Sequence, residues 1–188
     1  MMITTVLFLA GALVAVAAML AGHRLFGFPG QRADDYSGTE PVFDPARHLA
    51  GRMIAHGVIF GPTGRVASRF TAGMEGDWQG EAGRLRERFR FAGGGTQARE
   101  WRLRLAPGGR ITATADDIIG TATGRASGAG LRLCYRLRLA PDAGGHVLSA
   151  TDWMYLMEDG TIVNRSEMRK FGLPVAMLVA TIRPVRDV

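Results

Sequence analysis

Hydrophobic and polar residues alternate with a period of two along most of the chain after residue 49. The clearest run covers 131–139, where arginine fills most of the positions between Leu131, Leu133, Tyr135, Leu137 and Leu139. Successive side chains of a β-strand point to opposite faces. This run therefore predicts a strand with one buried face and one face in water.

Similar short runs recur along the chain and are separated by glycine-rich turns. They span 66–74, 85–91, 101–105, 111–115, 147–157, 162–171 and 173–182. The runs 85–91 and 101–105 flank three consecutive glycines and are predicted to form a hairpin. No long segment of 3.6-residue period interrupts the series, so the pattern predicts an all-β, antiparallel barrel of about eight to ten strands, whose closure leaves no exposed edge.

The N-terminal segment has a different pattern, because it is apolar throughout and carries no charged residue from position 1 to 22. A helix of about 20 such residues would cover the roughly 30 Å of a bilayer's hydrocarbon core. A cleaved secretory signal is the alternative, with Ala15-Val16-Ala17 as a cleavage site, although no basic residue precedes the apolar run. We expect residues 1–25 to be a membrane anchor or signal segment, residues 26–46 a Gly- and Pro-containing linker, and residues 47–188 the β-barrel domain.

Charge and cysteine content restrict the chemistry of the domain. The formal net charge is +6, and every basic residue except Lys170 is an arginine. Arginines on the solvent-exposed faces of neighbouring strands could form a positively charged surface that binds nucleic acid. However, no aromatic residue alternates with them to stack a base, so no nucleic-acid partner is expected. The single cysteine, Cys134, permits no intramolecular disulfide, and the histidines lack metal-ligand spacing. The sequence predicts no metal and no cofactor.

A few polar residues fall on the face that the alternation assigns to the core. Glu87 is in step with Leu85 and Phe89, and Arg99 is in step with Trp101. A hairpin centred near Gly94 would place Phe89 opposite Arg99 and Glu87 opposite Trp101, which makes Glu87 and Arg99 diagonal neighbours. Burying a charge is costly unless it is paired, so we expect a buried ion pair between them.

Other polar residues are placed less sharply by the pattern. Asn164, Ser166 and Lys170 share the apolar face of the strand at 162–171, so Lys170 is expected to face inward. Asp116 and Asp117 are adjacent, so either one lies outside or a bulge turns both inward. Neither face is clearly apolar around Asp152. The candidate ligand-binding residues are Glu87, Arg99, Trp101, Asp116, Asp117, Tyr135, Asp152, Trp153, Asn164 and Lys170. The alternative for each is a hydrogen-bonded core network that sets the strand register.

Several short segments recur together in one bacterial family. They are Gly76-Asp77-Trp78, Glu87-x-Phe89, Arg99-x-Trp101, Ala115-Asp116-Asp117-Ile118-Ile119-Gly120, Asp152-Trp153-Met154-Tyr155, Asn164-Arg165-Ser166 and Lys170-Phe171-Gly172. With these segments the chain resembles the family called domain of unknown function 3833 from about Pro41 to Arg183. The resemblance implies a lipocalin-like (calycin-type) barrel and supplies no catalytic residue. Its members commonly look like exported lipoproteins, which implies a periplasmic domain tethered to the inner membrane.

These observations favour a membrane-tethered barrel that binds a lipid or another amphipathic small molecule. The tail would lie among Phe89, Trp101 and Tyr135, with an anionic head held by Arg99 or Lys170. One alternative is a cofactor-independent isomerase or lyase in which Glu87 or Asp117 moves a proton. The other is a structural envelope protein without a ligand. The pattern favours binding over catalysis and does not determine the oligomeric state.

Overall fold

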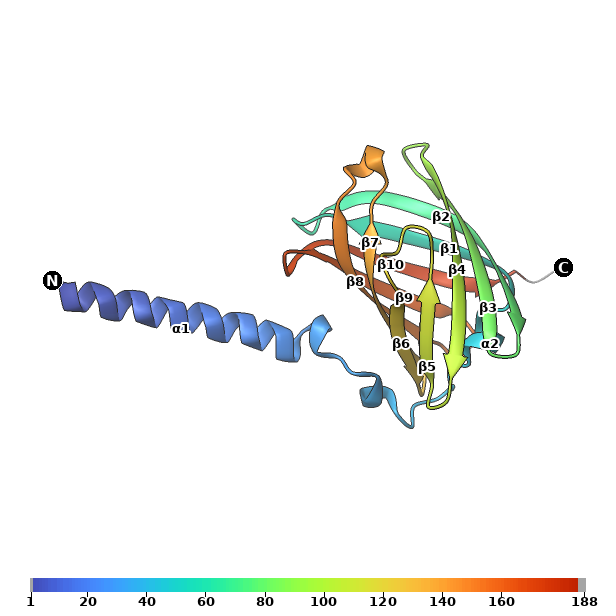
Figure 1. Cartoon of the computed structure of the whole chain (residues 1–188), viewed down its shortest axis with the longest axis horizontal. Helices are drawn as coiled ribbons and strands as arrows, with labels where there is room; N and C mark the ends of the chain where they lie inside the picture. Colours follow the sequence, from blue (N-terminus) through green and yellow to red (C-terminus); the bar gives the residue numbers. More distant parts are fainter. Residues whose placement is uncertain (1, 186–188) are drawn as a thin grey trace. The chain divides into compact units, whose positions relative to one another are not determined.

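The computed structural model describes residues 2–185, which contain ten antiparallel strands closed into a barrel (Figure 1). The strands are β1 (Gly51–Phe60), β2 (Val66–Gln79), β3 (Ala82–Phe91), β4 (Thr96–Ala106), β5 (Arg110–Thr114), β6 (Ala122–Ser127), β7 (Gly130–Arg138), β8 (Val147–Leu156), β9 (Ile162–Lys170) and β10 (Leu173–Pro184). The prediction of an all-β antiparallel barrel is confirmed.

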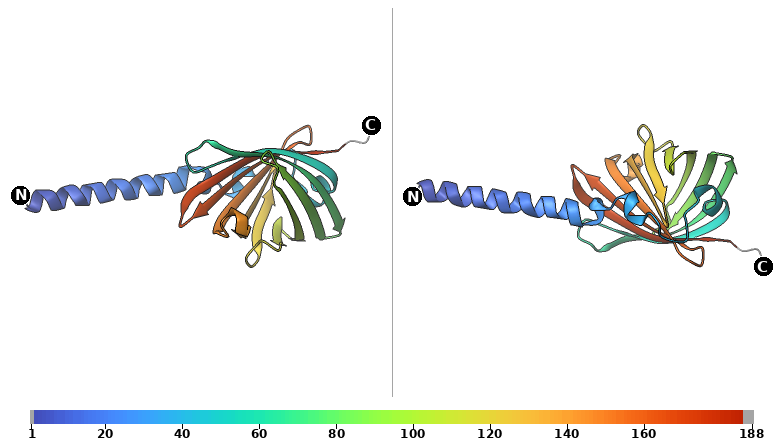
Figure 2. Two further views of the ribbon diagram at one scale, coloured as in Figure 1. Left: turned by 90° about the horizontal axis from the view of Figure 1, so that it is seen from above. Right: turned by 90° about the horizontal axis from the view of Figure 1, so that it is seen from below.

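Each strand pairs with its neighbours in the sequence, and β10 returns to pair with β1, as Figure 2 shows from above and below. The closing pair runs from Met53 opposite Pro184 to Phe60 opposite Met177. The turns after β1, β3, β5, β7 and β9 lie at one end of the barrel, called the upper end here, and the remaining turns lie at the lower end. Closure removes the exposed edges that an open sheet of this size would present.

Two strands were not predicted from the alternation, β1 and β6. The inward positions of β6 include Ala122 and Gly124, so the strand shows little hydrophobic contrast between its faces. Gly124 is required there, because a Cβ at this position would lie 2.1 Å from the carbonyl oxygen of Arg132. Small residues allow close approach of neighbouring backbone, and they also weaken the periodic signal.

The hairpin of β3 and β4 forms with a different register from the predicted one. Glu87 pairs directly with Arg99, and Phe89 pairs with Gln97. The predicted centre at Gly94 was wrong, and the centre lies at Gly93. The reason is the turn, in which Gly94 adopts φ +88° and the N–H of Phe91 donates to the carbonyl of Gly95 at 2.9 Å.

The lower end of the barrel is closed by the segment around α2 (Pro45–His48). Phe43 and Leu49, on either side of this short helix, are each 2% exposed. The indole Nε1 of Trp78 donates a hydrogen bond of 3.2 Å to the carbonyl of Leu49. This apolar segment therefore fills the space that an open barrel end would leave to water.

The compact unit that contains the barrel begins at Tyr36, before the predicted domain boundary at residue 47. The ring of Tyr36, the last residue of η2 (Ala33–Tyr36), lies 5.1 Å from that of Trp153 and 5.5 Å from that of Tyr155. Thr39 Oγ1 accepts a hydrogen bond of 2.9 Å from the backbone of Ala129. Residues 36–46 thus pack and hydrogen-bond with the barrel.

The other compact unit ends at Asp35 and contains α1 (Met2–Phe26) and η1 (Phe28–Gly30). Apolar side chains of α1 are exposed along its length, with Ile3 and Phe8 each at 76%. Among the described residues, none of the helices combines the length and the apolar character needed to span a membrane.

Candidate functional site

The barrel encloses a cavity of about 190 Å³. Most of its wall consists of apolar and aromatic side chains, which include Phe70, Phe89, Trp101 and Leu178. Among the described residues, every strand except β6 contributes to the wall. The polar residues in the wall are Glu87, Gln97, Arg99, Tyr135, Asp152, Asn164 and Ser166. An apolar space with a few convergent polar groups is typical of small-molecule sites.

The cavity approaches solvent at the upper end of the barrel. Lining residues toward the lower end, such as Leu85 and Ile111, are 3% and 2% exposed. Toward the upper end, Phe89, Phe91 and Leu178 are half-buried. The rings of Phe89 and Phe91 stack with their centroids 6.2 Å apart. We call these three residues the mouth of the cavity.

Glu87 lies in the cavity wall, and its side chain is 11% exposed. Its Oε2 accepts a hydrogen bond of 3.3 Å from the indole Nε1 of Trp101. Burial raises the pKa of Glu87 to about 7, and the nearby Arg99 guanidinium opposes this rise. A carboxyl group with this pKa can both accept and release a proton near neutral pH.

Arg99 binds Asp117 more closely than it binds Glu87. Its Nε and Nη2 donate to the Asp117 carboxylate, with the shortest contact 2.6 Å, whereas Nη1 lies 3.9 Å from Glu87 Oε2. The expected Glu87–Arg99 pair is therefore present as the longer of two contacts. Asp117 reaches this position because the turn that follows β5 is closed by the N–H of Ile118 donating to the carbonyl of Ala115 at 3.0 Å.

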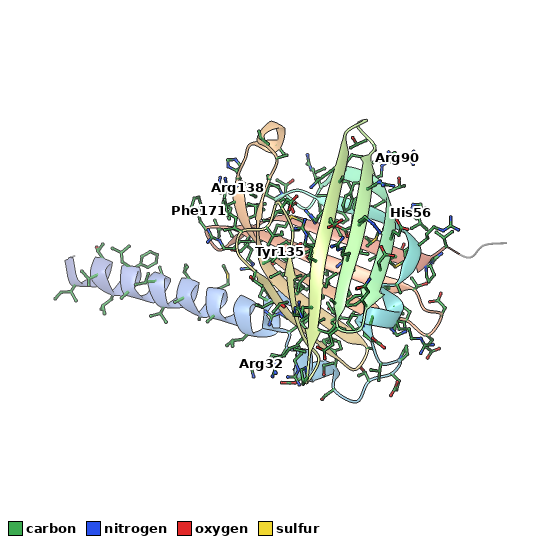
Figure 3. All side chains as sticks on the ribbon, turned by 45° about the vertical axis from the view of Figure 1, so that its right-hand side comes forward. Arg32, His56, Arg90, Tyr135, Arg138 and Phe171 are labelled. Carbon is green, nitrogen blue, oxygen red and sulfur yellow. The ribbon has the colours of Figure 1, made fainter. Side chains whose placement is uncertain are left out.

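A second polar pair joins β7 and β8 across the cavity wall. The hydroxyl of Tyr135, labelled in Figure 3, donates to Asp152 Oδ2 at 2.9 Å. Burial raises the pKa of Asp152 above its usual value, although hydrogen bonds from Ser166 and Tyr135 oppose the rise. Burial also raises the pKa of Tyr135 well above its usual value. The phenol therefore stays protonated and remains a donor.

Asn164 contributes to the wall beside this pair. Its Nδ2 donates to the carbonyl of Trp153 at 3.0 Å, and its Oδ1 accepts from the hydroxyl of Ser166 at 3.4 Å. Asn164 and Ser166, both on β9, are buried at 8% and 3% exposure. The amide of Asn164 is thus held in place from two sides.

Four predicted site residues do not line the cavity, and one of them, Asp117, is joined to the wall through Arg99. Asp116 is exposed and pairs with Arg102 at 3.2 Å. Of the two alternatives for Asp116 and Asp117, the structure therefore shows the one in which one aspartate lies outside. Trp153 is fully buried but packs against Tyr36 on the outer side of β8. Lys170 lies at the end of β9, where its Nζ is 3.0 Å from His146 Nδ1, and it does not line the cavity.

Some lining residues were not among the predicted site residues. Gln97 is in step with Arg99 and Trp101, so the alternation could have identified it as an inward-facing residue. Ser166 was assigned to the inner face of its strand. The apolar residues Phe70, Met154 and Leu178 carry no chemical signal in the sequence, because an apolar side chain that lines a cavity looks the same as one that fills a core.

The described residues contain no group of three or more His, Cys, Asp or Glu side chains that could hold a metal ion. Cys134 is half-buried, and its Sγ lies 3.8 Å from Thr151 Oγ1. The arrangement in the wall instead offers hydrogen-bond donors and acceptors and one carboxyl group that titrates near neutral pH.

Comparison with known proteins bears on the fold and the family. The crystal structure of Rv2717c from M. tuberculosis is similar with a TM-score of 0.52 and 18% sequence identity, over 77% of this chain and 99% of that one. At this identity the similarity shows the fold alone. None of the curated proteins compared with the chain matches it. The family DUF3833, described as a protein of unknown function, matches residues 23–184, and the chain therefore belongs to the DUF3833 family.

Proposed function

We propose that the barrel binds a slim amphipathic small molecule, such as a single-chain lipid, in its cavity. The observation that carries this proposal is the largely apolar cavity whose wall contains four ionisable polar residues, Glu87, Arg99, Tyr135 and Asp152. The cavity volume of about 190 Å³ lies below the roughly 300–1,000 Å³ of sites for drug-sized ligands, which favours one narrow chain over a bulky ring system.

The arrangement of the wall supports a ligand with two chemically different parts. Trp101 and Tyr135 pack edge to face with their ring centroids 5.3 Å apart, beside the polar residues. Apolar side chains such as Leu85 and Leu133 continue from there toward the closed lower end. A ligand can place its apolar part against these side chains and its polar part against the four polar residues.

Native mass spectrometry of the full-length protein, followed by extraction and identification of lipids, tests the proposal. We expect a stoichiometric small molecule that is lost in Leu178→Trp, because the larger ring fills the mouth. Val179→Trp is the matched control, since Val179 is the next residue of β10, is 38% exposed and does not line the cavity. A protein that is isolated empty and that binds no added lipid would favour the structural envelope role instead.

We further propose that the chain is held at the inner membrane with its barrel in the periplasm. The exposed apolar side chains of α1 support attachment to a membrane, and the family resemblance supports export. Fractionation of expressing cells is the test. The full chain should sediment with membranes after a high-salt wash, whereas a chain that starts at residue 36 should not, and equal distribution of the two would contradict attachment through α1.

Glu87 favours a second candidate, a cofactor-independent isomerase or lyase. Its carboxyl group lies in the cavity wall and has a pKa raised to about 7, which suits a group that takes and returns a proton. Glu87→Gln separates the two candidates once the ligand is known. Loss of turnover with binding retained would support catalysis, and absence of any turnover by the unaltered protein would leave binding alone.

A further inference from the structure

The cation in the cavity wall is already engaged by a carboxylate. Arg99 donates from Nε and Nη2 to Asp117 over 2.6 to 3.1 Å, and its remaining terminal nitrogen faces Glu87 at 3.9 Å. A bidentate contact of this kind is among the stronger hydrogen-bonded pairs in proteins. An anionic ligand would have to compete with Asp117 for the same guanidinium.

The polar residues around Arg99 carry more acidic than basic groups. One guanidinium is accompanied by three carboxyl groups, those of Glu87 and Asp152 in the wall and that of Asp117 bound to Arg99. Among the described residues, no other Lys or Arg lines the cavity. Protonation of Glu87 still leaves two carboxyl groups against one cation. The carboxylate or phosphate group of a ligand placed against this wall would therefore meet an acidic surface. Because that surface is partly shielded from water, the ligand's negative charge and the carboxylates would repel strongly.

Asp152 has an oxygen atom that receives no hydrogen bond. Its side chain is 8% exposed and lines the cavity, and its Oδ2 accepts from Tyr135. Its Oδ1 is buried and has no donor among the described residues. The Ser166 hydroxyl lies opposite Asp152 in the neighbouring strand and opposes the rise in the pKa of Asp152, but it also lies 3.4 Å from Asn164 Oδ1. Its single proton cannot satisfy both acceptors at once. A buried acceptor is expected to be satisfied, here by a group that enters the cavity.

We propose that the ligand presents a hydrogen-bond donor, a hydroxyl or an ammonium group, to Asp152 Oδ1, and that carboxylate and phosphate heads are rejected. This inference rests on the proposed function, since it concerns the head of the ligand bound in the same cavity. The apolar part of the ligand lies against Trp101 and the neighbouring aromatic side chains. The site thus selects uncharged or cationic amphiphiles, in contrast to the anionic head expected from the sequence.

Three amphiphiles with the same chain test the inference on the full-length protein: decanol, decylamine and decanoate. Each competes at pH 8 with the uncharged, single-chain fluorescent dye parinaryl alcohol, whose emission rises in an apolar cavity. We expect decanol and decylamine to displace the dye at concentrations at least about tenfold lower than decanoate does, because repulsion from the acidic wall is worth more than 1.4 kcal/mol. Decanoate that competes as well as decanol would overturn the inference.

Asp152→Asn tests the residue itself. The amide oxygen can still accept from Tyr135, but the charge is gone, so the preference for decylamine over decanoate should fall by about tenfold. Asp116→Asn makes the same change on the exposed outer face and should keep the preference. An unchanged preference in Asp152→Asn, with a circular dichroism spectrum like that of the unaltered protein, would overturn the role of Asp152. If this variant does not fold, the ranking of the three amphiphiles on the unaltered protein still decides the inference.

The same experiment separates this inference from the proposed function. Dye binding that is unchanged by Leu178→Trp, together with no competition from any of the three amphiphiles, would contradict binding in the cavity and both proposals with it. Dye binding that is lost in Leu178→Trp, with decanoate as the best competitor, would keep the cavity as a binding site and overturn only the assignment of its head group.

Discussion

At the scale of single residues, the buried carboxyl group of Glu87 is the main electrostatic feature of the barrel. It lies opposite Arg99 in the neighbouring strand, yet Arg99 makes its short contacts with Asp117. Glu87 is left with one hydrogen bond of 3.3 Å from Trp101 and with the cost of burial. Because burial outweighs the attraction of Arg99, its pKa is raised to about 7.

This raised pKa makes the stability of the barrel depend on pH. Between the usual pKa of Glu87 and about 7, the folded protein holds a proton that the unfolded chain has released, so the free energy of unfolding falls as the pH rises through this interval. The full cost is on the order of 3 kcal/mol above pH 7. Glu87→Gln carries no charge, so its free energy of unfolding should fall less between pH 5 and pH 8. Urea denaturation at several pH values measures this difference.

Glu75→Gln is the matched control for the pH prediction, because Glu75 is exposed on the outer face of β2. The control should keep the pH dependence of the unaltered protein. Asp152 contributes in the same direction and is unchanged in both variants, so part of the dependence should persist in Glu87→Gln. Identical profiles for Glu87→Gln and the unaltered protein would show that Glu87 is ionised at little cost.

At the scale of elements, the end of β2 joins the barrel wall to the segment that closes its lower end. A Cβ at Gly76 would lie 1.7 Å from the carbonyl oxygen of Leu49, so only glycine lets the two backbones approach. Trp78, two residues further along the same face, donates its Nε1 proton to that carbonyl. The Gly76-Asp77-Trp78 segment therefore has a structural explanation that needs no ligand.

Gly76→Ala should destabilise the barrel strongly, because the added methyl group meets backbone rather than a flexible side chain. Overpacking of this kind costs about 1–3 kcal/mol, and we expect the upper part of that range. Gly73→Ala is the matched control: it lies in the same strand, and its Cβ would meet nothing within 4 Å. Thermal unfolding followed by circular dichroism compares the two, and equal melting temperatures would contradict the close contact with Leu49.

At the scale of the whole molecule, the barrel depends on residues that precede its first strand. Phe43 and Leu49 belong to the core, and the N–H of Phe43 donates to the carbonyl of Gly128 at 2.8 Å. Tyr36 covers Trp153 and Tyr155 on the outer side of the barrel. The compact unit therefore extends from Tyr36, and residues 36–46 act as part of the domain.

Two truncations test this boundary. A chain that starts at residue 36 should keep the melting temperature of the full-length protein. A chain that starts at residue 47 should unfold at a markedly lower temperature, because it loses Phe43 and exposes Trp153; removing one buried aromatic side chain alone costs about 3–5 kcal/mol. Calorimetry on the two truncated proteins measures the difference. Equal melting temperatures would show that residues 36–46 do not stabilise the barrel and act only as a linker.

The amino-acid sequence by itself determined the all-β class, the antiparallel barrel, the inner faces of most strands and the burial of Glu87 and Arg99. These features follow from alternation with a period of two, which depends only on positions along one strand. Only the tertiary structure decided that Arg99 binds Asp117, that Trp153 lies outside the cavity, that Lys170 lies at a strand end and that residues 36–49 cover and close the barrel. Those contacts join segments far apart in the chain, and their geometry depends on turn conformation, register and closure, for which local periodicity carries no information.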